Sequence, residues 1–210
     1  MPRMAIVARN LESVSAVAVA GETLPLPDPA AVFAHFSGPL SKGARMLDDT
    51  ALNLRSFLLP ALDLRVIFEP TRIRFEALSA KKPAEQPLGE RLAATIAAVY
   101  PGRPFPRFGF NYDIAYQYDA VIQQRAILGA FLDKETIEDA THFGWQFSLA
   151  KDKNRRRETY FCKVVSPLEL RIMSNIELDQ ALPADPKAAQ ALYERCYTEC
   201  QGIVEHLRIS

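Results

Sequence analysis

The sequence predicts an α+β protein in which an antiparallel sheet is covered on one face by helices and a C-terminal helix ends the fold. Segments that alternate apolar and polar residues come in runs rather than singly. The gaps inside these runs are short enough for hairpins, which join antiparallel strands. Segments with helical spacing lie between the runs. This grouping favours α+β over an alternating βαβ arrangement.

Period-two alternation places the strands. The predicted strands are 4–8, 14–20, 62–69, 72–78, 108–119, 143–149, 158–165 and 168–178. Residues 9–13 are interpreted as the turn between the first two strands, and residues 70–71 as the hairpin turn between the next two. Residues 40–60 stay ambiguous, because their leucines have helical spacing and a proline ends the segment.

Two aspartate–proline pairs, 28–29 and 185–186, predict helix starts. The carboxylate can accept from free backbone N–H groups, and the proline has no N–H group to leave unpaired. We expect the first of these helices to end near 38–39 and the second to run toward residue 207. Helical spacing predicts two further helices, at 88–100 and 120–132.

Composition limits the kind of protein. The 210 residues are 49% apolar, enough to bury a core in one compact domain spanning 1–210 or in two closely packed sub-lobes with a boundary near 80–104. Twenty-five basic residues balance 25 acidic ones, which gives no overall attraction to nucleic acid or membrane. Low net charge removes one protection against self-association, in keeping with a homo-oligomer. An odd cysteine count favours a reducing cytoplasm.

The stretch FGFNYDIAYQYD, residues 108–119, carries its bulky side chains on one parity. One apolar and one polar face is typical of a sheet packed on one side, so this aromatic row is predicted to face the core. The alternative is a groove for an extended peptide or for stacked bases, formed by Tyr112, Tyr116 and Tyr118. The two aspartates of the opposite parity would repel phosphate, which favours the core interpretation.

Residues 151–157 form the densest charge cluster, with five cations and one anion between two predicted strands. We expect a hairpin tip there, either as a solvated loop or as a finger that binds nucleic-acid phosphate or an acidic partner. The candidate binding residues are Lys151, Lys153, Arg155, Arg156 and Arg157.

Cysteine spacing raises the question of a metal site. Cys196 and Cys200 share one face of the last helix and could bind a metal together with Cys162 and a histidine. Both thiols lie within the apolar stripe of that helix, however, and free cysteine is among the most buried residue types. Core packing is therefore predicted, and no metal or cofactor is expected.

No catalytic motif is present in the sequence, and His35 and His142 are isolated. The preferred hypothesis is a cytoplasmic, non-catalytic binding or assembly protein that acts through protein–protein contacts, and in one version holds an extended peptide. The first alternative is a nucleic-acid-associated factor that uses the 151–157 loop. The second is an enzyme whose active site is assembled from distant residues near His35 or His142.

Overall fold

The computed structural model describes residues 4–36, 43–123, 127 and 143–207. The strands are β1 (Ile6–Val19), β2 (Arg45–Asp49), β3 (Leu54–Leu59), β4 (Leu64–Glu69), β5 (Arg72–Ala77), β6 (Arg107–Tyr118), β7 (Phe143–Lys151), β8 (Arg156–Ser166) and β9 (Glu169–Leu178). The helices are α1 (Pro29–His35), α2 (Leu88–Val99) and α5 (Pro186–Gly202). Short 3-10 turns are η2 (Pro60–Leu62), η3 (Asp152–Asn154) and η4 (Ile203–His206).

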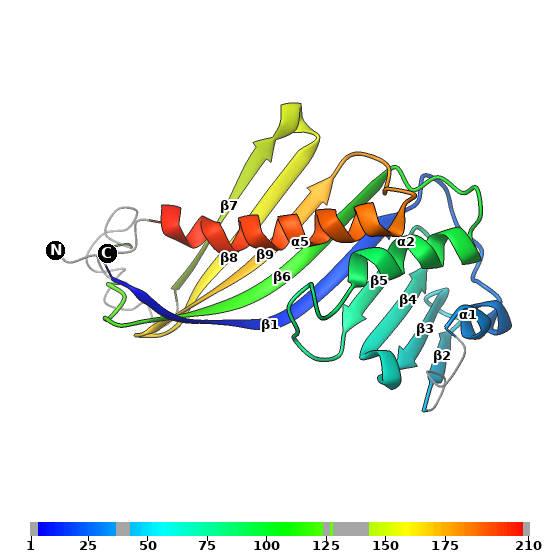
Figure 1. Ribbon diagram of the computed structural model, residues 1–210, viewed down its shortest axis with the longest axis horizontal. Helices are drawn as coiled ribbons and strands as arrows, with labels where there is room; N and C mark the ends of the chain where they lie inside the picture. The colour runs from blue at the N-terminus through cyan, green and yellow to red at the C-terminus, as the bar shows by residue number, and fades with distance from the viewer. Residues whose placement is uncertain (1–3, 37–42, 124–126, 128–142, 208–210) are drawn as a thin grey trace.

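The nine strands of the described ranges all join one antiparallel sheet in the order β2-β3-β4-β5-β1-β6-β9-β8-β7 (Figure 1). Helices α2 and α5 lie side by side on one face of this sheet, and α1 lies next to α2. The predicted α+β class, with an antiparallel sheet and a C-terminal helix, is confirmed. No helix in the described part of the chain has both the length and the apolar character needed to cross a membrane.

The first strand differs from the prediction. Instead of two strands with a turn at 9–13, the chain forms one strand of 14 residues. Its register with β6 shifts between Ile6 and Ala8 and again between Leu11 and Ser13. Such irregularities let a long strand bend without ending it. The turn prediction is wrong because the polar residues of 9–13 occupy a bulged stretch of strand and not a loop.

The ambiguous segment 40–60 contains the hairpin of β2 and β3, paired from Arg45 with Leu58 to Asp49 with Leu54. The Asp49 carboxylate stabilises the turn, because it accepts from the backbone N–H groups of Ala51 and Leu52, each at 3.1 Å. The helical spacing of the leucines is therefore coincidental.

The helix starts follow the sequence signals. Asp28 accepts from the N–H group of Ala30 at 3.0 Å, and Asp185 accepts from that of Lys187 at 3.1 Å. In both helices the proline occupies the first turn. The predicted helix at 88–100 is confirmed as α2. The predicted helix at 120–132 lies largely outside the described residues.

The core lies between the sheet and the helices. On β6 it receives Phe108, Phe110, Tyr112, Ile114, Tyr116 and Tyr118, each at most 5% exposed. The prediction that this aromatic row faces the core is confirmed. Tyr193 of α5 stacks on Tyr112, with ring centroids 5.5 Å apart, and the Tyr112 hydroxyl donates to the Tyr193 carbonyl oxygen at 2.7 Å. These contacts hold α5 against the middle of the sheet.

Close helix packing completes the core. A Cβ atom at Gly89 of α2 would lie 2.6 Å from the carbonyl oxygen of Ala189 in α5, so glycine allows the two helices to approach this closely. The three cysteines, Cys162, Cys196 and Cys200, are free and buried, as the core prediction required. Burial raises the pKa of the Cys196 thiol to about 11 and those of Cys162 and Cys200 to about 12.

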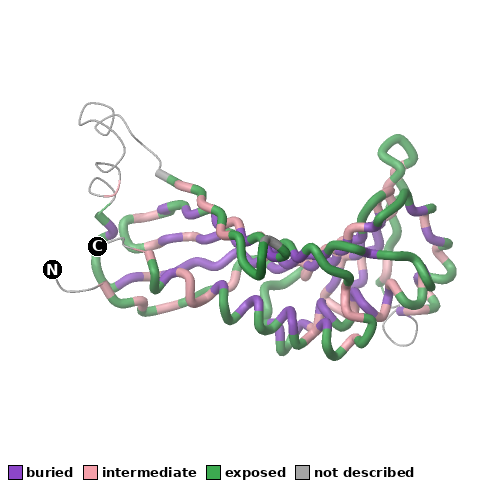
Figure 2. Tube along the Cα trace, turned by 90° about the horizontal axis from the view of Figure 1, so that it is seen from above, coloured by how far each residue is buried: buried purple, intermediate pink, exposed green. Residues whose placement is uncertain are grey.

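The face turned away from the helices, here called the outer face, is concave. Figure 2 shows both ends of the sheet bending away from the side that carries the helices. Residues that alternate with the core residues point to this face, so it carries the polar half of each strand's pattern.

Candidate functional site

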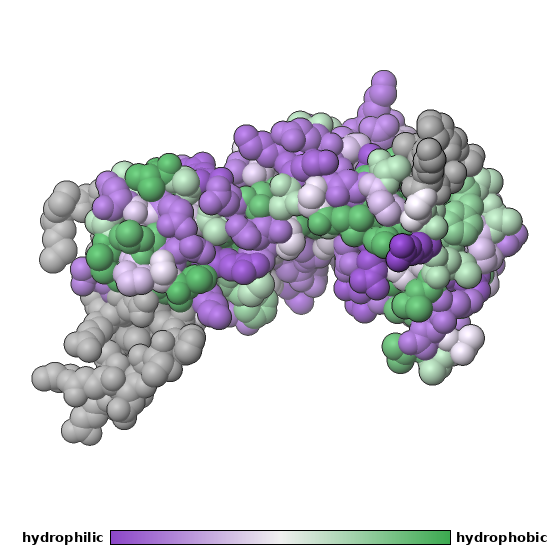
Figure 3. Space-filling view, turned by 90° about the horizontal axis from the view of Figure 1, so that it is seen from below, coloured by the Kyte–Doolittle hydropathy of each residue, from purple (hydrophilic) through white to green (hydrophobic). Residues whose placement is uncertain are grey.

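A groove of about 530 Å³ lies on the outer face. Its lining comes from β5, β1, β6, β9 and the start of β8, which are adjacent strands near the middle of the sheet. The space-filling view in Figure 3 shows the molecule hollowed between its two ends, with hydrophilic residues over much of the neighbouring surface. Five arginines and two carboxylates line the groove, a formal surplus of three positive charges.

Strand register brings distant arginines into one row across the groove. Val17 of β1 pairs with Arg74 of β5 on one side and with Gly109 of β6 on the other. Gly109 pairs with Glu177 of β9, which in turn pairs with Arg157 of β8. The row therefore crosses five strands and has an arginine at each end.

A second row runs beside the first. Val19 pairs with Arg72 of β5 and with Arg107 of β6. On the far side, the backbone N–H of Asp179 donates to the carbonyl oxygen of Arg155 at 2.7 Å, so these two residues are also neighbours. This row carries three arginines and one carboxylate.

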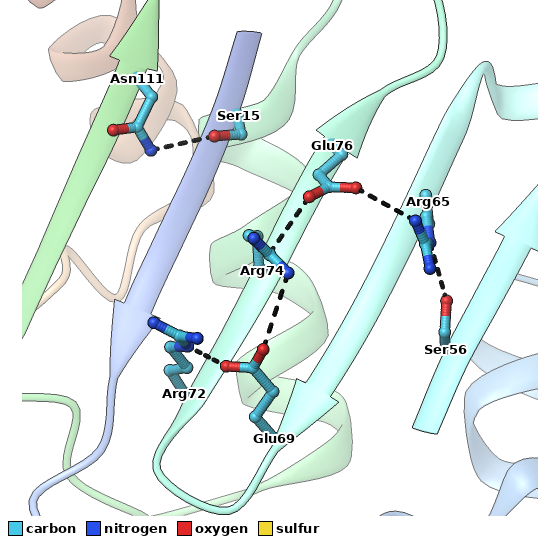
Figure 4. Close-up of polar contacts among 8 residues, drawn as sticks. All are labelled: Ser15, Ser56, Arg65, Glu69, Arg72, Arg74, Glu76 and Asn111. Carbon is cyan, nitrogen blue, oxygen red and sulfur yellow. Dashed lines mark hydrogen bonds and ion pairs between the residues drawn. The ribbon is translucent and has the colours of Figure 1, made fainter. Parts of the chain in front are cut away.

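Carboxylates hold the arginines of β5 in place (Figure 4). Arg72 pairs with Glu69. Arg74 lies 3.2 Å from a carboxylate oxygen of Glu76 and 3.6 Å from one of Glu69. Glu76 also pairs with Arg65 of β4 at 3.7 Å. This network orients the β5 wall of the groove and neutralises part of its charge.

The other three groove arginines, Arg107, Arg155 and Arg157, are exposed and form no ion pair with any residue that the structure describes. Glu177, which lies nearest to Arg157 in the register, accepts instead from the side-chain amide of Asn175 at 3.1 Å. A guanidinium group is always charged at ordinary pH and offers paired N–H donors that match phosphate and carboxylate. These three side chains can therefore bind an anion without first breaking an internal ion pair.

The floor of the groove combines close backbone contact with polar groups. A Cβ atom at Gly109 would lie 2.6 Å from the carbonyl oxygen of Ile176, so β9 approaches β6 more closely than any side chain there would allow. Beside it, the Asn111 side-chain amide donates to the Ser15 hydroxyl at 3.0 Å (Figure 4). The floor thus presents amide and hydroxyl groups to a ligand held by the arginines.

The predicted basic loop does form a hairpin tip, because β7 ends at Lys151 and β8 begins at Arg156. However, side chains alternate between the two faces of a strand, so the cations of this loop do not all point the same way. Arg155 and Arg157 line the groove, and Lys153 is exposed at the tip. Arg156 points to the helix face and is only 5% exposed, so the expectation that it is available for binding at the tip is wrong.

Arg156 belongs to a buried ion cluster between β8 and α5. Its Nη2 atom lies 2.6 Å from Oε1 of Glu158 and 2.5 Å from Oε2 of Glu199. The Glu158 side chain is fully buried. Its Oε1 atom also lies 2.9 Å from Nζ of Lys151, and its Oε2 atom accepts from the Tyr160 hydroxyl at 2.7 Å. Lys151 and Arg156 therefore stabilise the fold at this hairpin.

The tyrosines of the proposed aromatic groove lie on the opposite face. Tyr112, Tyr116 and Tyr118 are 1%, 0% and 5% exposed in the core. Burial raises the pKa of Tyr118 to about 12. Among the described residues, the hydroxyls of Tyr116 and Tyr118 have no hydrogen-bond partner. A peptide could reach these rings only if the helices left the sheet.

The two aspartates of the 108–119 stretch do not act as the sequence suggested. Asp113 is on the outer face, but Arg171 of β9 binds both of its carboxylate oxygens, with one contact at 2.7 Å. Asp119 accepts from the backbone N–H of Ala5 at 2.8 Å. The Asp113 charge, which we expected to repel phosphate, is therefore compensated on the surface where the groove lies.

Sequence reasoning missed Arg72, Arg74 and Arg107 as site residues. The alternation of Arg72 and Arg74 in a predicted strand was visible, as was the shared parity of Arg107 and Asn111. Their convergence depends on the strand order β5-β1-β6-β9-β8, which no local pattern contains.

The two described histidines, His35 and His206, do not line this groove. The Nε2 atom of His35 lies 3.0 Å from the hydroxyl of Thr95, between α1 and α2, and burial lowers the pKa of this histidine. His142 lies outside the described residues. Across the described ranges, no group of three or more histidine, cysteine or acidic side chains is placed to hold a metal ion.

No protein-family model matches this chain, and no curated protein matches its sequence at a significant level.

Proposed function

We propose that this protein is a binding protein for an anionic ligand with several phosphate or carboxylate groups, held in the outer-face groove. The observation that carries this proposal is the convergence of Arg72, Arg74, Arg107, Arg155 and Arg157 around one concave site. These residues come from three separate parts of the sequence.

The chemistry of the lining supports binding. Arginine forms charge-assisted, paired hydrogen bonds to phosphate and carboxylate, which are stronger than neutral ones. The polar floor supplies further groups for orientation, and a volume of about 530 Å³ falls in the range of small-ligand sites. Because arginines remain protonated at neutral pH, they bind charge and do not transfer protons.

The spacing of the arginines favours an elongated ligand. The first row has Arg74 at one end and Arg157 at the other, four strand spacings apart. At about 4.8 Å per spacing, the strand axes at the two ends are roughly 19 Å apart. A short single-stranded oligonucleotide satisfies this geometry, and this gives the nucleic-acid hypothesis a second basic wall opposite the 151–157 loop.

The test is a fluorescence anisotropy titration of the whole protein with a labelled short single-stranded oligonucleotide, with inorganic triphosphate and an acidic peptide as competitors. We expect the double variant R107A/R157A to bind at least about tenfold more weakly, since a hydrogen bond to a charged group contributes about 1.5–3 kcal/mol. The salt dependence should also flatten, by about 0.7 in log–log slope for each lost phosphate contact.

The matched control is Arg195→Ala. Arg195 is exposed on α5, on the opposite face of the sheet, and its only ion pair among the described residues is with Glu199 at 4.0 Å. This variant removes the same kind of charge and should bind like the wild type. Equal binding by R107A/R157A and the wild type, or no binding of any of the three anions at low salt, would overturn the proposal.

A further inference from the structure

The two edges of the sheet differ in how they are protected from pairing with another strand. The β2 edge has only five residues, of which Arg45, Asp48 and Asp49 are charged. Short, charged edges resist strand addition. The β7 edge has nine residues, no proline, and a single charge, Lys151, at its end. No strand within the described ranges pairs with its outer side.

The β7 edge is also regular. Its register with β8 is unbroken from Phe143 opposite Val164 to Lys151 opposite Arg156. In contrast, the pairings of β1 with β6 and of β8 with β9 contain shifts. Bulges are one means by which edge strands are turned away from new partners, and β7 has none. A strand of nine residues presents an edge about 30 Å long.

We propose that β7 pairs antiparallel with β7 of a second copy of this chain, which joins two sheets across a two-fold axis. No residue of β7 lines the groove. The β7 sequence is self-complementary about a two-fold axis. With the axis at Phe147, Trp145 lies opposite Leu149 of the second copy, and Gln146 lies opposite its Ser148. Between 145 and 149, apolar positions therefore meet apolar positions, and polar positions meet polar ones.

Charge also favours this partner. In the same register Lys151 lies opposite residue 143 of the second copy, so no like charges meet along the strand. The chain as a whole has a formal net charge of zero, so two copies do not repel each other over long range.

The apolar side chains of β7 also favour a second copy of the chain as the partner. Trp145, Phe147 and Leu149 are half-buried on the helix side of β7. Phe147 stacks on Tyr160 of β8, with ring centroids 5.1 Å apart, so it is fixed on one side by its own sheet. Pairing would cover the other side of this stripe. Because a single strand pair buries less surface than a standard interface, the dimer should dissociate on dilution.

The test is sedimentation velocity over a wide range of protein concentrations. We expect the wild type to pass from monomer to dimer as concentration rises. The variant Q146K/S148K places lysines opposite lysines and should remain monomeric. Both positions are exposed on the outer face, so the fold should persist, which circular dichroism checks.

Two comparisons make the test specific. A mixture of Q146K/S148K with Q146E/S148E should restore the dimer, because opposite charges then face each other across the axis. The control A191K/T198K adds the same charge at exposed positions of α5 and should dimerise like the wild type. A wild type that stays monomeric at every concentration, or a Q146K/S148K variant that dimerises equally well, would overturn the proposal.

Discussion

Phe110 and Asn111 are adjacent in β6, yet they lie in different environments. Phe110 is fully buried, with its ring centroid 5.1 Å from that of Tyr193. Asn111 lies on the outer face in the floor of the groove, and its side-chain amide donates to the Ser15 hydroxyl. The same contrast separates Arg156, in the buried cluster, from Arg157, in the groove. On this sheet, stability and the candidate binding function are divided by residue parity, so single substitutions can test each one separately.

The largest difference between the faces should appear at Phe110 and Asn111. Phe110→Ala removes a fully buried ring, so we expect the free energy of unfolding to fall by about 3–5 kcal/mol. Asn111→Ala removes one hydrogen bond of a half-buried side chain, and should cost about 1 kcal/mol. Urea denaturation of both variants measures the difference. Equal losses would mean that the outer face also carries a large share of stability.

Arg156 and Arg157 repeat the comparison with charged residues. Arg156→Ala leaves the buried Glu158 with Lys151 and Tyr160 as partners. The free energy of unfolding should therefore fall by about 3 kcal/mol, the lower end for a broken buried ion pair. Arg157→Ala should change stability by less than about 0.5 kcal/mol, as at other exposed sites. Chemical denaturation is the measurement, and comparable losses for the two variants would contradict the assignment of faces.

Gly109 tests whether close strand packing shapes the groove. Gly109→Ala places a Cβ atom 2.6 Å from a backbone oxygen, so the strands must move apart, at a cost of roughly 1–3 kcal/mol. Gly202→Ala is the matched control, because nothing lies within 4 Å of its added Cβ atom. Thermal and urea unfolding of both variants should show a loss only at Gly109. A neutral Gly109→Ala would show that β6 and β9 are not constrained there.

Alkaline pH should lower the free energy of unfolding through the thiols buried on the core face. The pKa values of the buried thiols are raised from 9.0 to about 12 for Cys162 and Cys200. Below about pH 9 the thiols are protonated in both states, and their full contribution is present. As pH rises above this value, the unfolded thiols ionise while the buried ones stay neutral, so stability falls.

The expected loss is on the order of 1 kcal/mol per thiol by about pH 10. Urea unfolding between about pH 8 and pH 11 measures it. The variant C162S/C200S lacks these thiols and should show a smaller decline than the wild type. An equal decline in both proteins would assign the pH dependence to other groups.

Local signals explain which parts of the fold the sequence could predict. Asp28 and Asp185 cap helices through their own side chains, and the aromatic row of β6 alternates without interruption. The strands β4 and β5 alternate in the same way across a two-residue turn. Each of these elements depends on residues close together in the chain, so the pattern was sufficient.

The remaining features depend on contacts between distant residues. The continuity of β1 through 9–13 requires bulged pairing with β6, which no pattern within β1 reveals. The alternation pattern predicts that the strand after the basic loop starts at residue 158, but β8 begins at Arg156. That difference of two residues assigned Arg156 and Arg157 to one loop instead of to opposite faces.

The position of β1 in the sheet has a consequence for protein synthesis. Its neighbours β5 and β6 follow it in the chain, and Ile6 must find Tyr118. Pairings between such distant residues slow folding, and β1 can complete them only after residue 118 has been synthesised. Three of its core-facing residues, Val14, Ala16 and Ala18, are small. Before the sheet forms, we expect these three positions to expose less apolar surface than leucine or phenylalanine would at the same sites.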